Sequence, residues 1–256
     1  MRIDVHSHVR VRDGCLDVEQ LNSLIEAADR LGIDQMWCSR PISGGMPEPE
    51  AIRAGNDAVI EAMRLYPERI RGECFVVPGW YREALDEIDR CLDAGMIGIK
   101  LYNQYFINDP AVFPVIEKAI DCGVFVLDHA GHLMDTPTQR SQPKISDGVH
   151  FADLARRYPE ATLIMGHIGG GGDYEWSLQA LADAPTVFAD TSGSVIDEGV
   201  IEYAVRLLGA DRLLFACDLS EEAGVGKVLG ANISAEERQA IFGGNAQAIL
   251  SRRKAR

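Results

Sequence analysis

Short apolar or alternating runs recur along the whole chain and predict eight β-strands. These runs lie at about residues 2–6, 33–38, 71–77, 97–101, 123–128, 162–167, 186–191 and 212–217. Between them, apolar residues recur at spacings of three and four, as in segments 18–25 and 151–155, which is the period of an amphipathic helix. Strands that alternate with helices predict a parallel sheet, because parallel neighbours need a crossover between them.

Glycines at the ends of the predicted helices agree with this pattern. Gly32, Gly95 and Gly123 each precede a new strand, as glycine helix caps do. An open doubly wound sheet would normally carry a glycine-rich phosphate loop after its first strand, whereas this chain has His-Ser-His-Val-Arg there. A length of 256 residues suits one barrel. We therefore predict an α/β fold, a (β/α)8 TIM barrel, with residues 1–256 forming a single domain.

Composition narrows the list of partners. A net charge of −14 opposes binding to nucleic acid or to an anionic membrane. No apolar run approaches the roughly 20 residues of a membrane helix, and the start of the chain has no signal-peptide core. The six cysteines lack CxxC spacing and are expected to be reduced thiols. We expect a cytoplasmic protein that binds a small-molecule substrate; a homodimer is left open.

Two histidines stand one residue apart where the first strand ends. Alternation in a strand turns His6 and His8 to the same face, and in a barrel both would lie at the C-terminal mouth, close enough to bind one metal ion. The alternative is that ordinary hydrogen bonds hold both rings. His129, His167 and Asp218 each close a later apolar run, and this recurrence favours a shared site.

Alternation within each strand tests that arrangement. A residue two positions before a mouth-facing side chain should itself face the barrel core. This rule places Leu127, Met165 and Ala216 in the core, with the site residues two positions later at the mouth. Lys100 shares its face with Gly98, so we expect its ammonium group at the same mouth.

The order HxH, Lys, His, His, Asp across eight strands resembles the amidohydrolase superfamily. Its amidohydrolase-related (amidohydrolase 2) branch is suggested by four motifs: Ile-Asp-Val-His-Ser-His at the start, Gly98-Ile-Lys-Leu, Gly166-His167 and Gly244-Asn245-Ala246. The resemblance implies one divalent metal ion, most often zinc. It also implies that the ligands are His6, His8, His129 and Asp218.

The same resemblance implies the catalytic roles. His167 would be a catalytic imidazole beside a metal-bound water, and Asp218 would both bind the metal and accept a proton. In binuclear relatives a lysine at the position of Lys100 is carboxylated and bridges two metals; we favour one metal here. Lys100 then either contacts substrate or forms a salt bridge to an inward carboxylate such as Asp4 or Glu73.

Further candidates for substrate contact follow the second and fourth strands. They are Arg40, Tyr102 and Tyr105. The long polar segment 130–147 adds His132 and Arg140, and such long loops on a barrel are often functional. Surface solvation is the alternative for this segment, and we favour it for Lys144.

These residues predict an enzyme. The first hypothesis is a metal-dependent hydrolase of a small ester, lactone or amide. The alternative is a nonoxidative decarboxylase or hydratase of an unsaturated carboxylic acid, which a cationic pocket from Arg40, Arg140 or Lys100 would favour. A metal-dependent nuclease is disfavoured by the acidity of the chain, and a barrel that binds without turnover is disfavoured by the full set of proposed ligands.

Overall fold

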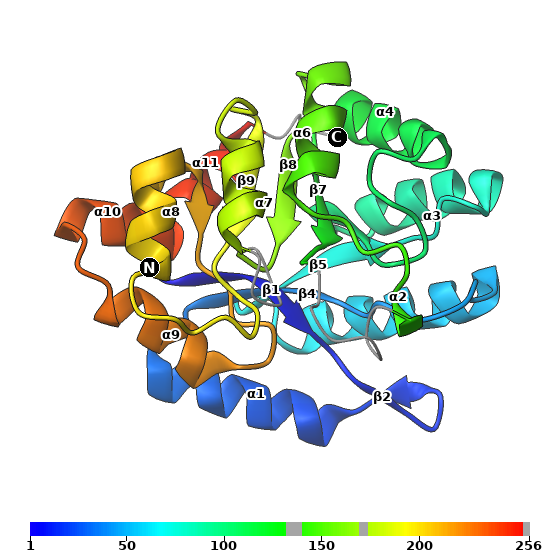
Figure 1. The fold of residues 1–256 in the computed structure, drawn as a ribbon. Helices are drawn as coiled ribbons and strands as arrows, with labels where there is room; N and C mark the ends of the chain where they lie inside the picture. Colours follow the sequence, from blue (N-terminus) through cyan, green and yellow to red (C-terminus); the bar gives the residue numbers. More distant parts are fainter. Residues whose placement is uncertain (132–139, 169–173, 253–256) are drawn as a thin grey trace.

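The eight predicted strands form one parallel sheet that closes on itself. The computed structural model describes residues 1–131, 140–168 and 174–252 (Figure 1). In sheet order the strands are β1 (Ile3–His8), β4 (Gln35–Ser39), β5 (Ile70–Phe75), β6 (Gly98–Leu101), β7 (Phe125–His129), β8 (Leu163–Gly166), β9 (Val187–Asp190) and β10 (Leu213–Leu214). The Val5 amide donates to the Phe215 carbonyl at 3.0 Å, and the Asp218 amide donates to the His6 carbonyl at 2.8 Å. These two hydrogen bonds join β1 to the segment that directly follows β10, so the predicted TIM barrel is confirmed.

Helices surround the barrel and follow its strands. They are α1 (Val18–Leu31), α2 (Pro49–Leu65), α3 (Tyr81–Asp93), α4 (Phe113–Cys122), α6 (Gly148–Arg157), α7 (Tyr174–Leu181), α8 (Val200–Leu208), α9 (Glu221–Gly230), α10 (Ala235–Gln239) and α11 (Asn245–Ser251). A short hairpin of β2 (Val11–Arg12) and β3 (Cys15–Leu16) precedes α1. Gly32 and Gly123 end α1 and α4 in the left-handed conformation, as predicted. No helix in the described ranges is both long and apolar enough to span a bilayer.

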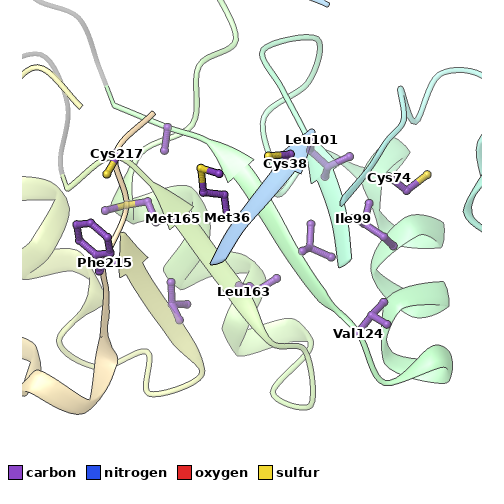
Figure 2. Close-up of a cluster of buried hydrophobic side chains, with 14 of the residues drawn as sticks. Met36, Cys38, Cys74, Ile99, Leu101, Val124, Leu163, Met165, Phe215 and Cys217 are labelled. Carbon is purple, nitrogen blue, oxygen red and sulfur yellow. The ribbon is translucent and has the colours of Figure 1, made fainter. Parts of the chain in front are cut away.

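The barrel wall separates two apolar layers. Inside it, Trp37 stacks on Phe125 with ring centroids 4.9 Å apart, and α11 adds Ile249 to this inner cluster. Outside it, the opposite faces of the strands pack against the helices, as Figure 2 shows for side chains such as Met36, Cys74 and Phe215. Leu127 and Ala216 belong to the inner layer, as predicted.

The prediction for Met165 is wrong. Met165 lies in the outer layer (Figure 2). Ile164 takes the inner position on β8. The reason is that β8 ends at Gly166, and His167 has a φ of 70°. His167 therefore leaves the alternation of the strand, and its face cannot be read from the residue two positions before it.

Candidate active site

A β-bulge in β1 determines where the first two histidines point. Ile3 and Asp4 pair with Gln35 and Met36, but Ser7 and His8 pair with Cys38 and Ser39. Two residues, Val5 and His6, therefore lie opposite Trp37 alone. One extra residue in a strand shifts its alternation by one. Val5 thus belongs to the inner layer below, and His6 and His8 still reach the mouth above.

The side chain of Asp4 holds this bulge. Its Oδ1 accepts hydrogen bonds from the backbone amides of His6 at 3.0 Å and Cys217 at 2.9 Å. Asp4 is fully buried, and its burial raises the pKa of the carboxyl well above the usual value, although the two backbone hydrogen bonds act in the opposite direction. Asp4 thereby joins the bulge to the chain segment that carries Asp218.

Asp190, at the end of β9, orients His6. Its Oδ2 lies 2.8 Å from His6 Nδ1, and its Oδ1 accepts from the His167 amide at 2.9 Å and from the Ser192 hydroxyl at 2.6 Å. These bonds and the neighbouring His6 ring outweigh burial, so the pKa of Asp190 lies below its usual value. Because a carboxylate only accepts, His6 Nδ1 carries the proton and Nε2 presents its lone pair to the mouth.

The hydrogen bonds also show which ring nitrogens of His167 and His129 carry protons. Since the Ser192 hydroxyl donates to Asp190, its oxygen accepts from His167 Nδ1 at 3.0 Å. His167 Nε2 is then the acceptor for His129 Nδ1, at 2.9 Å. Burial and the neighbouring His6 lower the pKa of His167 to about 4. His167 is therefore a neutral imidazole at pH 7.

Three donor atoms converge at the mouth. Asp218 Oδ1 lies 3.0 Å from His8 Nε2 and 4.0 Å from His6 Nε2, and all three atoms lie within 4.8 Å of one another. Two imidazoles and one carboxylate are ligands that divalent transition metals accept. His6, His167 and Asp190 form a second group of this kind. Both oxygens of Asp190 already accept hydrogen bonds. We therefore interpret this second group as residues that orient the ligands of the first group.

Asp218 is ionised and faces the open side of the site. Its φ is 50°, and its side chain is 29% exposed. Burial opposes its charge, but the hydrogen bond from His8 and the nearby rings of His6 and His167 outweigh it and place its pKa well below the usual value. His167 Nε2 lies 3.7 Å from Asp218 Oδ2. The ionised carboxylate of Asp218 and the neutral imidazole of His167 are therefore neighbours.

Lys100 lies beneath this group of residues. It is fully buried, and its Nζ lies 2.7 Å from His6 Nε2. The salt bridge considered for Lys100 is not found among the described residues. Asp4 shares its register with the outward Met36, and both carboxylate oxygens of Glu73 lack a hydrogen-bond partner.

A cavity of about 500 Å³ opens onto the donor atoms. Its wall includes His8, Arg10, Arg40, Tyr102, His129 and Asp218. The Tyr102 ring packs on His129 with centroids 4.3 Å apart. Arg140 is exposed and is not among the residues that line this cavity. His132 lies outside the described residues.

The sequence comparison identifies the family. A family model described as Amidohydrolase matches residues 3–252. The chain belongs to this amidohydrolase family. No protein with a curated description matches the sequence.

Solved structures share the fold of this amidohydrolase. A protein of Staphylococcus aureus classed as an amidohydrolase has a TM-score of 0.78 at 17% identity, with 98% of this chain and 99% of that chain covered. A dihydroxybenzoic acid decarboxylase from a Polaromonas species, with bound manganese, has 0.75 at 19%, covering 99% and 98%. A 4-oxalomesaconate hydratase from Rhodopseudomonas palustris has 0.73 at 17%, covering 98% and 96%. At such identities the likeness shows the fold alone.

Sequence reasoning missed three residues of the site in this amidohydrolase. Asp190 closes the run before it just as Asp218 does, so the same signal was available. Arg10 follows His8 by two positions, and its place on the cavity wall depends on the connection between β1 and β2. Asp4 was considered only as a partner for Lys100, because its role as an acceptor for two amides depends on a bulge that the residue pattern does not reveal.

We predict that Asp4→Ala weakens divalent metal binding by about tenfold or more and lowers the free energy of unfolding by about 1–3 kcal/mol, because two buried amides lose their acceptor. Asp4→Asn keeps an oxygen that can accept from both amides, so it should stay near the parent. Competition with a chromophoric chelator and urea unfolding measure the two quantities. Equal losses in both variants would exclude this hydrogen bond as the cause.

We predict that Asp190→Asn weakens metal binding by about 10–100-fold. An amide nitrogen facing His6 Nδ1 favours the other tautomer, which puts a proton on Nε2. Asp183→Asn, at an exposed turn before β9, is the matched control and should bind as the parent does. The chelator competition applies here too. An affinity unchanged in Asp190→Asn would show that His6 is oriented by other contacts.

Proposed function

We propose that this amidohydrolase is a divalent-metal-dependent lyase that decarboxylates a small unsaturated or aromatic carboxylic acid. The observation that carries the proposal is the cavity above the donor atoms, whose wall bears both Arg10 and Arg40. Two arginines on the wall of one cavity favour a substrate with a carboxylate, although Arg40 Nη1 also donates to the Pro41 carbonyl at 2.6 Å. Dihydroxybenzoic acid decarboxylase, a structural relative, agrees with this choice.

The metal would be held by His6, His8 and Asp218, with His129 as the further ligand expected from the sequence. A bound divalent ion supplies Lewis acidity toward a substrate oxygen. We expect zinc, because a donor set rich in imidazoles suits this metal. Manganese is the second metal to test, because a structural relative has manganese bound.

The residues of the chain can move the proton that decarboxylation needs. The carbon–carboxylate bond breaks, carbon dioxide leaves, and the carbon must gain a proton. The ionised Asp218 can take a proton from a substrate hydroxyl and return it to that carbon, while Arg40 holds a carboxylate and Tyr102 packs against a flat ring. The neutral His167, 3.7 Å from Asp218, can polarise the substrate or share the proton.

Hydrolysis of a small ester, lactone or amide is the second candidate. Two groups in the site favour hydrolysis, since the ionised Asp218 and the neutral His167 are both bases. A base beside a metal site activates water for attack on a carbonyl. The two reactions differ in product and are separable by assay.

We expect enzyme loaded with zinc or manganese to release carbon dioxide from hydroxybenzoates or unsaturated carboxylic acids, and to leave neutral lactones and esters intact. Arg40→Ala should raise KM about tenfold or more, because the carboxylate loses a charged hydrogen-bond donor. Arg64→Ala, which removes an exposed arginine on α2, is the control. Decarboxylation is measured with a coupled assay for carbon dioxide, and hydrolysis with a pH-indicator assay for acid release. Hydrolysis of a neutral lactone with KM unchanged in Arg40→Ala would favour the second candidate.

We expect His167→Ala to retain the metal and to lose about a hundredfold or more in kcat, because its imidazole faces Asp218 but lies outside the three converging donors. Metal content and turnover are measured on the same preparation. His150→Ala, which removes an imidazole from α6, controls for the loss of a ring. Metal loss as complete as in His6→Ala would make His167 a ligand, and unchanged turnover would leave the proton transfer to Asp218 alone.

A further inference from the structure

The ammonium group of Lys100 contacts the same nitrogen, His6 Nε2, that a metal ion would need. Its Nζ lies 2.7 Å from His6 Nε2, and that nitrogen belongs to the three-atom donor group. Nδ1 of the same ring is taken by Asp190. One lone pair serves either an ammonium proton or a metal ion. Metal binding through His6 therefore requires the ammonium group of Lys100 to move away.

Glu73 offers a place for that ammonium group. On adjacent strands Lys100 pairs with Phe75, and Gly98 pairs with Glu73, so Glu73 faces the same interior one layer deeper. Glu73 is fully buried, and neither of its oxygens has a hydrogen-bond partner in the part of the chain that the structure describes. A buried carboxyl group without a partner is unfavourable, and a cation beside it relieves that cost.

Gly98, which pairs with Glu73 across the two strands, carries no side chain beside that carboxyl group. A Cβ at Gly98 would lie 2.3 Å from the Phe125 ring, so the ring fills the position that a side chain would take. Electrostatics point the same way. Burial raises the pKa of Glu73 to about 8, and Lys100 is the group that lowers it most. Burial lowers the pKa of Lys100, and Glu73 is the group that raises it most.

We propose that Lys100 and Glu73 act as a displaceable pair that sets metal affinity: Lys100 holds His6 Nε2 in the metal-free protein and moves onto Glu73 when a divalent ion takes that nitrogen. The two side chains are positioning residues, since they act on the metal through His6. This inference rests on the metal site of the proposed function and not on its reaction. It assigns Lys100 a role without carboxylation and without a second metal.

The test measures binding of zinc or manganese alone, without substrate, by chelator competition in four proteins. Glu73→Gln should weaken binding by about tenfold or more, because the ammonium group stays beside the ion. Lys100→Met should bind as tightly as the parent or more tightly. The double variant Lys100→Met with Glu73→Gln should recover the affinity of Lys100→Met, because the glutamate matters only while the lysine is present.

The outcomes distinguish failure of the Lys100–Glu73 pair from failure of the proposed metal site. Parent protein that binds no metal tightly, or that binds as well after His6→Ala, overturns both the metal site and the pair. Tight parent binding with Glu73→Gln unchanged overturns the pair alone. Loss of metal in Lys100→Met, or two ions per chain in the parent, would make Lys100 a ligand. Should a variant not fold, the metal-loaded parent decides by crystallography: Nζ within about 3 Å of a Glu73 oxygen supports the pair, and Nζ still on His6 excludes it.

Discussion

The bulge in β1 is the constraint on which the site depends. A TIM barrel needs apolar side chains inside its lower part and polar ligands at its mouth, both on the inner face of each strand. In β1 the residues Ile3 and Val5 are inward, so regular alternation would turn His6 toward the helices. The extra residue resolves this conflict within one strand. Asp4, whose position faces outward, then ties the bulge to the Cys217 amide and thus to the neighbouring Asp218.

Around this frame, hydrogen bonds to Asp190 fix which ring nitrogens carry protons. Asp190 directs the lone pair of His6 toward the mouth and, through Ser192, leaves His167 Nε2 as an acceptor. Such outer contacts orient candidate ligands before a metal ion binds. The sequence run that ends at Asp190 is as informative as the run that ends at Asp218, and recognising it would have completed this network.

The fold could be predicted from the sequence because its evidence repeats. Eight apolar runs, helical spacing between them and glycine caps such as Gly32 and Gly123 all indicate the same barrel. The mouth could be predicted as well, since His129 and Asp218 close their runs. Local departures from alternation could not. The bulge at Val5 and His6 and the positive φ of His167 each shift a side chain by one face, and both depend on contacts with distant strands.

The apolar interior explains the state of the polar mouth. Trp37, Phe125 and Ile249 pack together inside the barrel, so the layer above them meets little water from that side. Burial is accordingly the largest cause of the lowered pKa values of His6, His8, His129 and His167. Neutral imidazoles are the form that binds metal. The same dry interior makes an unpaired charge unfavourable, so the buried Lys100 needs a partner in every state of the site, which His6 supplies in this structure.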